Sequence, residues 1–129
     1  SGELAALRAL DCVTVFPALP EVKFTFALTP EEKRQARDFN DRLLAAAAGQ
    51  SAELDVLLLD EVCAAVSTGL LDEEALLRFL REKPAGLEVL LTGRDPSAGL
   101  TELADYISEI RMVRHPFEKG VSAREGIEW

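Results

Sequence analysis

Two runs rich in apolar residues dominate the pattern of hydrophobic and polar positions along this chain. Residues 56–59 read Val-Leu-Leu-Leu and continue into Asp60 and Glu61, and residues 87–91 continue into a Thr-Gly-Arg sequence. Apolar runs of this length predict strands that are buried on both faces, as in a parallel sheet covered by helices. The pattern therefore favours an α/β fold.

Helical patterns precede and connect these two predicted strands. Thr29, Pro30 and Glu32 form a capping-box sequence, which predicts a helix that begins at Pro30 and that Gly49 is placed to end. Two further helices are expected, one over residues 62–68 that ends at Gly69 and one over residues 73–83 that is capped by Asp72.

Two buried strands with helices between them form a βαβ unit, which places the carboxyl ends of both strands on one edge of the sheet. Asp60, Glu61 and Arg94 are therefore expected to face the same crevice. Ligands bind at this edge in open α/β sheets, and in P-loop nucleotide-binding proteins an Asp there helps to hold Mg²⁺. The motif alone leaves a structural alternative open, because acids are also common in the first turn of a helix that follows a strand.

The remaining segments give weaker patterns. They predict a short helix over residues 4–10, a strand over 12–16, an aromatic-bearing loop over 17–28, a short helix over 100–105, a strand over 106–112 and a glycine-punctuated tail over 114–129. Within the loop, Phe24 and Phe26 are either hydrophobic cover for the core or an apolar wall for a flat ligand.

The composition fits one domain and narrows the class of partner. The chain has 129 residues, of which 48% are hydrophobic, and a formal net charge of −9. This charge argues against nucleic acid and anionic membranes as partners, because both require a basic surface. Against this acidic background, four basic residues concentrate near the end of the chain, at Arg111, Arg114, Lys119 and Arg124, where a solvated tail is the simplest interpretation.

The two cysteines, Cys12 and Cys63, have no metal-ligand spacing and only one histidine to assist them. Both are expected to be buried thiols in a reducing compartment. No run approaches the length of a transmembrane helix and no signal peptide is visible, so a cytoplasmic protein is expected.

Several short motifs follow one another in an informative order. They are Leu59-Asp60-Glu61, Thr92-Gly93-Arg94, Ala104-Asp105, and Arg114-His115-Pro116-Phe117 with Gly120, Ala123, Gly126, Ile127 and Glu128. In this order and at about this spacing, the set resembles the ATP:corrinoid adenosyltransferases of the cobalamin pathway. The matches are densest over residues 54–129, which correspond to the later two-thirds of that family.

The resemblance implies a P-loop NTPase (RecA-like) fold, a three-layer α/β sandwich with a mostly parallel sheet. It also implies the transfer of the 5′-deoxyadenosyl group of ATP to the cobalt of a reduced corrinoid, with Mg²⁺ as cofactor. By position, Asp60 and Glu61 would bind Mg²⁺ and the nucleotide, and Thr92, Gly93 and Arg94 would line the same edge. On the corrinoid side, Phe24, Thr25 and Phe26 would meet the lower face of the corrinoid. His115 and Phe117 would belong to a loop that closes over the site.

The chain departs from the family pattern in four places. Lys23 replaces a glycine, Phe26 replaces a tryptophan, and Arg124 replaces a glutamine. The largest departure is that no stretch of the 129 residues reads Gly-x-x-x-x-Gly-Lys-Ser/Thr, the loop whose amides, lysine and hydroxyl bind phosphate and Mg²⁺. We therefore expect a single truncated domain over residues 1–129 that lacks the first P-loop strand.

Three hypotheses for function follow. The chain is a piece of an active adenosyltransferase, or a truncated, non-catalytic relative that acts as a corrinoid-binding or interaction module, or an unrelated α/β module. Because a sheet without its P-loop strand has unpaired apolar edges around residues 56–59, we also expect a homodimer or a rearranged sheet.

Overall fold

The computed structural model describes residues 2–17 and 28–124. The chain forms two compact units, one of residues 18–107 and the other of residues 1–17 together with residues 108–129. The segment 18–27, which contains Phe24, Thr25 and Phe26, and the end of the chain from residue 125 lie outside the described residues.

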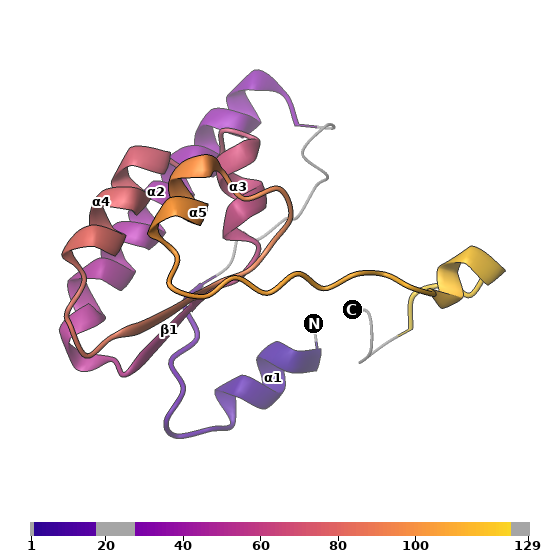
Figure 1. Cartoon of the computed structure of the whole chain (residues 1–129), viewed down its shortest axis with the longest axis horizontal. Coiled ribbons are helices and arrows are strands. Elements are labelled where there is room, and N and C mark those ends of the chain that lie inside the picture. The colour runs from indigo at the N-terminus through magenta and orange to yellow at the C-terminus, as the bar shows by residue number, and fades with distance from the viewer. Residues whose placement is uncertain (1, 18–27, 125–129) are drawn as a thin grey trace. The chain divides into compact units, whose positions relative to one another are not determined.

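The unit of residues 18–107 has the alternating α/β order that the sequence predicted (Figure 1). Its elements are α2 (Pro30–Gln50), the 3₁₀ helix η2 (Ser51–Glu53), β1 (Val56–Leu59), α3 (Val62–Ser67), α4 (Glu73–Glu82), β2 (Glu88–Leu91) and α5 (Ala98–Leu103). The predicted helices and both predicted strands of this unit are confirmed, with ends that shift by one or two residues.

Helix α2 begins where the local sequence requires it to begin. The Thr29 hydroxyl accepts a hydrogen bond from the Glu32 amide at 3.2 Å, and the Glu32 carboxylate accepts one from the Thr29 amide at 2.8 Å. This reciprocal capping box satisfies two amides that a helix N-terminus leaves without partners. The helix runs to Gln50, one residue beyond the predicted end at Gly49, and passes directly into η2.

Strands β1 and β2 pair in parallel, and the register places Val56 beside Glu88 and Leu59 beside Leu91. The chain between them forms α3 and α4, so the predicted βαβ unit is confirmed. Among the described residues the sheet has these two strands. Because the pair is parallel and in register, the residues that follow Leu59 and Leu91 leave the sheet side by side.

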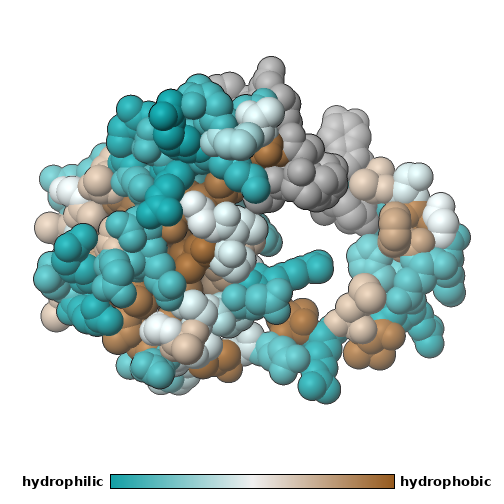
Figure 2. Space-filling model, turned by 90° about the horizontal axis from the view of Figure 1, so that it is seen from above, coloured by the Kyte–Doolittle hydropathy of each residue, from teal (hydrophilic) through white to brown (hydrophobic). Residues whose placement is uncertain are grey.

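The core of this unit lies between one face of the sheet and the helices. Leu76 of α4 is completely buried, and Leu77 beside it and Leu100 of α5 are nearly so. Leu59 and Leu91 pack against this cluster from the ends of the strands. Helices α2, α3, α4 and α5 lie on the same side of the strands (Figure 1). Viewed from that side, their outer surface is mainly hydrophilic, and apolar residues show in the seams (Figure 2).

The opposite face of the sheet is open, and the prediction of strands buried on both faces is wrong. The side chains of Val56, Leu58 and Leu90 are 56%, 54% and 49% exposed. Successive side chains of a strand point to opposite faces, so helices on one side leave every second residue uncovered. Within residues 28–107 the observed architecture is one helical layer on a small parallel sheet.

The second unit contains little regular structure among its described residues. It has α1 (Gly2–Arg8) and the 3₁₀ helix η3 (Pro116–Lys119). The strand predicted over residues 12–16 is absent, as is the one predicted over residues 106–112, which spans the boundary between the units. A strand needs a hydrogen-bonded neighbour, and neither segment has one among the described residues. Cys12 is exposed, contrary to expectation, whereas Cys63 of the other unit is buried as predicted.

None of the helices in the described part of the chain has the length and apolar character needed to cross a membrane.

The one-sided core predicts unequal costs for two leucine truncations. Leu76→Ala removes a side chain that is 0% exposed, so we expect a loss of about 3 kcal/mol in the free energy of unfolding. Leu90→Ala, on the open face, is expected to cost less than about 1 kcal/mol. Urea denaturation measures both. Equal losses for the two variants would contradict an open sheet face.

Candidate functional site

Three of the predicted site residues meet at the carboxyl ends of the two strands. Asp60 and Glu61 follow β1 directly, and Thr92 follows β2. The Thr92 hydroxyl donates a hydrogen bond to Oδ1 of Asp60 at 2.7 Å and accepts one from the Glu61 amide at 2.9 Å. The expectation that residues from both strand ends gather at one edge is confirmed for these three. Asp60 and Glu61 are exposed, so the cluster is open to ligands.

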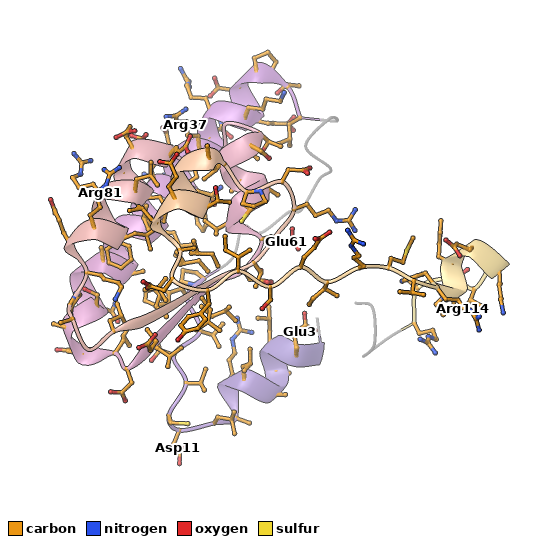
Figure 3. The ribbon with its side chains drawn as sticks, viewed as in Figure 1. Glu3, Asp11, Arg37, Glu61, Arg81 and Arg114 are labelled. Atoms are coloured by element: carbon orange, nitrogen blue, oxygen red, sulfur yellow. The ribbon has the colours of Figure 1, made fainter. Side chains whose placement is uncertain are left out.

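The backbone at Glu61 adopts a conformation that is uncommon for a residue with a side chain. Its φ of 54° and ψ of 20° lie in the left-handed region, and it is the residue that precedes α3. A non-glycine residue in this region carries strain of about 1 kcal/mol or more. Its amide hydrogen bond to Thr92 helps to offset that strain. Figure 3 shows Glu61 at the end of the sheet, apart from Arg37 on α2 and Arg81 on α4.

Gly93 brings the end of β2 into close contact with the first turn of α3. Its φ is +134°, and a Cβ atom at this position would lie 2.8 Å from Cβ of Cys63. The carbonyl of the preceding residue, Thr92, accepts a hydrogen bond from the Cys63 amide at 3.2 Å. The glycine is therefore required by packing and backbone conformation. Sequence reasoning assigned Gly93 to the nucleotide edge and missed this contact, which a Thr-Gly pair directly after a strand could have indicated.

Cys63 is a buried, free thiol beneath the cluster. Burial raises its pKa more than a backbone hydrogen bond lowers it, and the charge of Glu61 raises the pKa further. A raised pKa keeps the thiol protonated at neutral pH, which makes it a poor nucleophile. Cys63 therefore serves packing at this edge.

Two carboxylates of the cluster, those of Asp60 and Glu61, are candidate ligands for a magnesium ion. No group of three or more metal-binding side chains occurs in the described parts of the chain. Mg²⁺, however, is usually bound by one or two carboxylates together with water and substrate phosphates. Asp60 and Glu61 supply hard oxygen ligands of this kind, and Oδ2 of Asp60 has no hydrogen-bond partner among the described residues.

Of the remaining predicted residues, Gly93, Arg94, His115 and Phe117 are described, whereas Phe24, Thr25 and Phe26 lie outside the described residues. Arg94 is exposed and forms no ion pair with Asp60 or Glu61 among the described residues. His115 and Phe117 belong to the other compact unit, where Nδ1 of His115 accepts a hydrogen bond from the Phe117 amide at 3.1 Å. Phe117 is 75% exposed.

A hollow of about 360 Å³ lies elsewhere on the same unit, between α2 and α4. Apolar residues such as Leu44 and Phe79 line it together with Arg78 and Lys83. None of the predicted site residues takes part in it, so it gives no support to the predicted roles.

Comparison with known proteins identifies a family. A family model described as ATP:corrinoid adenosyltransferase BtuR/CobO/CobP matches residues 1–129. The chain is 40% identical to a corrinoid adenosyltransferase of Escherichia coli K12 over 78 residues. This aligned segment makes up 60% of the chain and 40% of that protein. The chain is 39% identical to a corrinoid adenosyltransferase from Sinorhizobium sp. over 75 residues, and this aligned segment makes up 57% of the chain and 35% of that protein.

A third relative, the corrinoid adenosyltransferase CobA of Salmonella typhimurium, is 37% identical over 76 residues, which covers 59% of the chain. The aligned segments span 35–40% of the length of these relatives.

The contact between Gly93 and Cys63 predicts a strong effect of a single methyl group. Gly93→Ala is expected to lower the free energy of unfolding by about 2 kcal/mol or more, because it adds strain at a positive φ and a clash with the first turn of α3. Gly86→Ala is the control, since nothing lies within 4 Å of its added Cβ atom. Thermal unfolding compares them, and similar stabilities would contradict the close contact.

Proposed function

The chain belongs to the ATP:corrinoid adenosyltransferase family, and from this premise we propose that it takes part in the transfer of the 5′-deoxyadenosyl group of ATP to the cobalt of a reduced corrinoid. The observation that carries the proposal is the cluster of Asp60, Glu61 and Thr92 at the carboxyl ends of paired parallel strands. This edge is where nucleotides bind in open α/β sheets.

On the nucleotide side, the two acids have distinct tasks. Asp60 is already oriented by a hydrogen bond and presents its second oxygen to a cation, whereas Glu61 adds a second negative charge at the start of α3. Bound Mg²⁺ would neutralise charge on the triphosphate that leaves ATP. Gly93 and Arg94 follow Thr92 at this edge, and the guanidinium of Arg94 is suited to contact phosphate oxygens.

On the corrinoid side, we propose roles for two aromatic segments. Phe24, Thr25 and Phe26 would form the apolar wall beneath the corrinoid, as their resemblance to the family pattern suggests. His115 and Phe117 would belong to a loop that closes over the site. The exposed ring of Phe117 and the hydrogen bond that fixes His115 beside it support such a contact role.

We further propose the P-loop, RecA-like three-layer fold for the family domain to which residues 1–129 belong, and a homodimer as its assembly. The side chains of Val56, Leu58 and Leu90 are exposed to water on the open sheet face, and this exposure lowers the stability of a small sheet. A further layer on this face would cover them. In the chain of 129 residues, we propose that a second copy supplies this layer.

The first functional test is Mg-ATP binding by the chain of 129 residues. The cluster offers two carboxylates but neither a free hydroxyl nor a cradle of amides for the phosphates, so we expect a Kd of about 1 mM, or about −4 kcal/mol. Asp60→Asn should weaken binding about tenfold, although it removes a repulsive charge. NMR shift titration with Mg-ATP measures the affinity.

Asp55→Asn provides the control, because Asp55 lies at the other end of β1 and carries the same charge. Its loss should leave the affinity unchanged or slightly higher, since it only reduces repulsion of the nucleotide. The proposed role of Asp60 would be contradicted if Asp55→Asn weakened Mg-ATP binding, or if Asp60→Asn left the affinity for Mg-ATP unchanged. Corrinoid binding without any Mg-ATP binding would favour a non-catalytic corrinoid-binding module.

The proposed assembly is tested by light scattering. We expect a dimer for the wild-type chain and a monomer for Leu58→Glu, because a carboxylate on the open face is costly to bury. Leu103→Glu, an exposed leucine on α5, should leave the dimer intact. A monomeric wild-type chain would refute the homodimer.

A further inference from the structure

We infer that Thr92 is a positioning residue: its hydroxyl holds the Asp60 carboxylate and the Glu61 backbone in the arrangement that receives Mg²⁺, and it does not itself contact the nucleotide. The inference rests on the proposed function and narrows the role that the family resemblance suggests for this residue. It depends on the two hydrogen bonds at the strand ends and on the way Thr92 is anchored.

The single donor of the Thr92 hydroxyl is already committed. A hydroxyl group has one proton to donate, and Thr92 gives it to Oδ1 of Asp60 at 2.7 Å. A phosphate oxygen is an acceptor and needs a donor, which this hydroxyl no longer offers. Hydrogen bonds to carboxylates and to phosphates are both charge-assisted, so a phosphate gains little by displacing Asp60.

The same oxygen holds the neighbouring acid through its backbone. It accepts the Glu61 amide at 2.9 Å, at the residue whose backbone is in the left-handed region. Without this acceptor, the amide would lose its partner and the strain at Glu61 would be relieved by a change of conformation. The direction in which the Glu61 carboxylate leaves the chain therefore depends on Thr92.

Thr92 is itself firmly placed, which a positioning residue requires. Its amide donates to the carbonyl of Leu59 at 3.2 Å, and its carbonyl accepts the Cys63 amide at 3.2 Å. Its β-branched side chain has few rotamers, so the hydroxyl is fixed once the backbone is fixed. One residue thus connects the end of β1, the Asp60 side chain and the first turn of α3.

The test compares Thr92→Val, which keeps the shape and removes the hydroxyl, with Thr92→Ser, which keeps the hydroxyl. Thr68→Val is the matched control, because the Thr68 hydroxyl donates to the Ala64 carbonyl at 2.7 Å at the other end of α3. The probe is Mn²⁺ alone, which takes oxygen ligands as Mg²⁺ does. Broadening of the Asp60 and Glu61 amide signals in NMR spectra of the full chain reports metal binding.

We expect Thr92→Val to need about tenfold more Mn²⁺ for the same broadening, the usual effect of removing a group that orients a metal ligand. Thr92→Ser and Thr68→Val should respond as the wild type does. An unchanged response of Thr92→Val, or a loss in Thr92→Ser equal to that in Thr92→Val, would overturn the inference. A wild-type chain without Mn²⁺ broadening at Asp60 would overturn it as well.

A second measurement needs no variant and applies even where Thr92→Val fails to fold. The Glu61 amide of the wild-type chain should exchange slowly with solvent although the residue is exposed, because it is bonded to Thr92. Rapid exchange would overturn the inference. A normal Mn²⁺ response together with no Mg-ATP binding would instead refute the proposed function and leave the role of Thr92 intact.

Discussion

The parallel pairing of β1 and β2 is the constraint on which the candidate site depends. Because the register places Leu59 beside Leu91, the chain delivers Asp60 and Thr92 to the same point from positions 32 residues apart. A shift of one residue would turn every side chain of a strand to the other face and separate the hydroxyl from the carboxylate. The helices keep this register by burying Leu59 and Leu91 against the core.

The unit of residues 18–107 is built to cover one face of its sheet. Helices α2 and α4 bury leucines on that face, whereas Val56, Leu58 and Leu90 remain in contact with water on the other. An isolated two-stranded sheet is marginally stable, and here the helical layer supplies the stability that the strands lack. The edge that carries Asp60 and Thr92 therefore depends on a core that lies entirely to one side of it.

The cluster also explains why residues of different kinds occur together at this edge. Thr92 supplies a hydroxyl that orients an acid, Gly93 lets the strand approach α3, and Cys63 fills the space beneath as a protonated thiol. Among the residues that hydrogen-bond to one another here, Asp60 and Glu61 carry the charged side chains. The geometry thus separates the residues that support the edge from those available for chemistry, a distinction that the family motif does not make.

Local signals in the sequence determined where α2 and α4 begin and that the fold is α/β. The capping box at Thr29 and the cap at Asp72 act within four residues of the chain, so the helix starts that they set can be predicted from the sequence alone. The motifs also determined the family, and they predicted that Asp60, Glu61 and Thr92 share an edge.

The tertiary structure decided which residues of that edge touch, that Glu61 takes a left-handed backbone, and that one sheet face stays open. It also decided that residues 12–16 and 106–112 are not strands among the described residues, because pairing and burial depend on neighbours distant in the chain, which local patterns do not record.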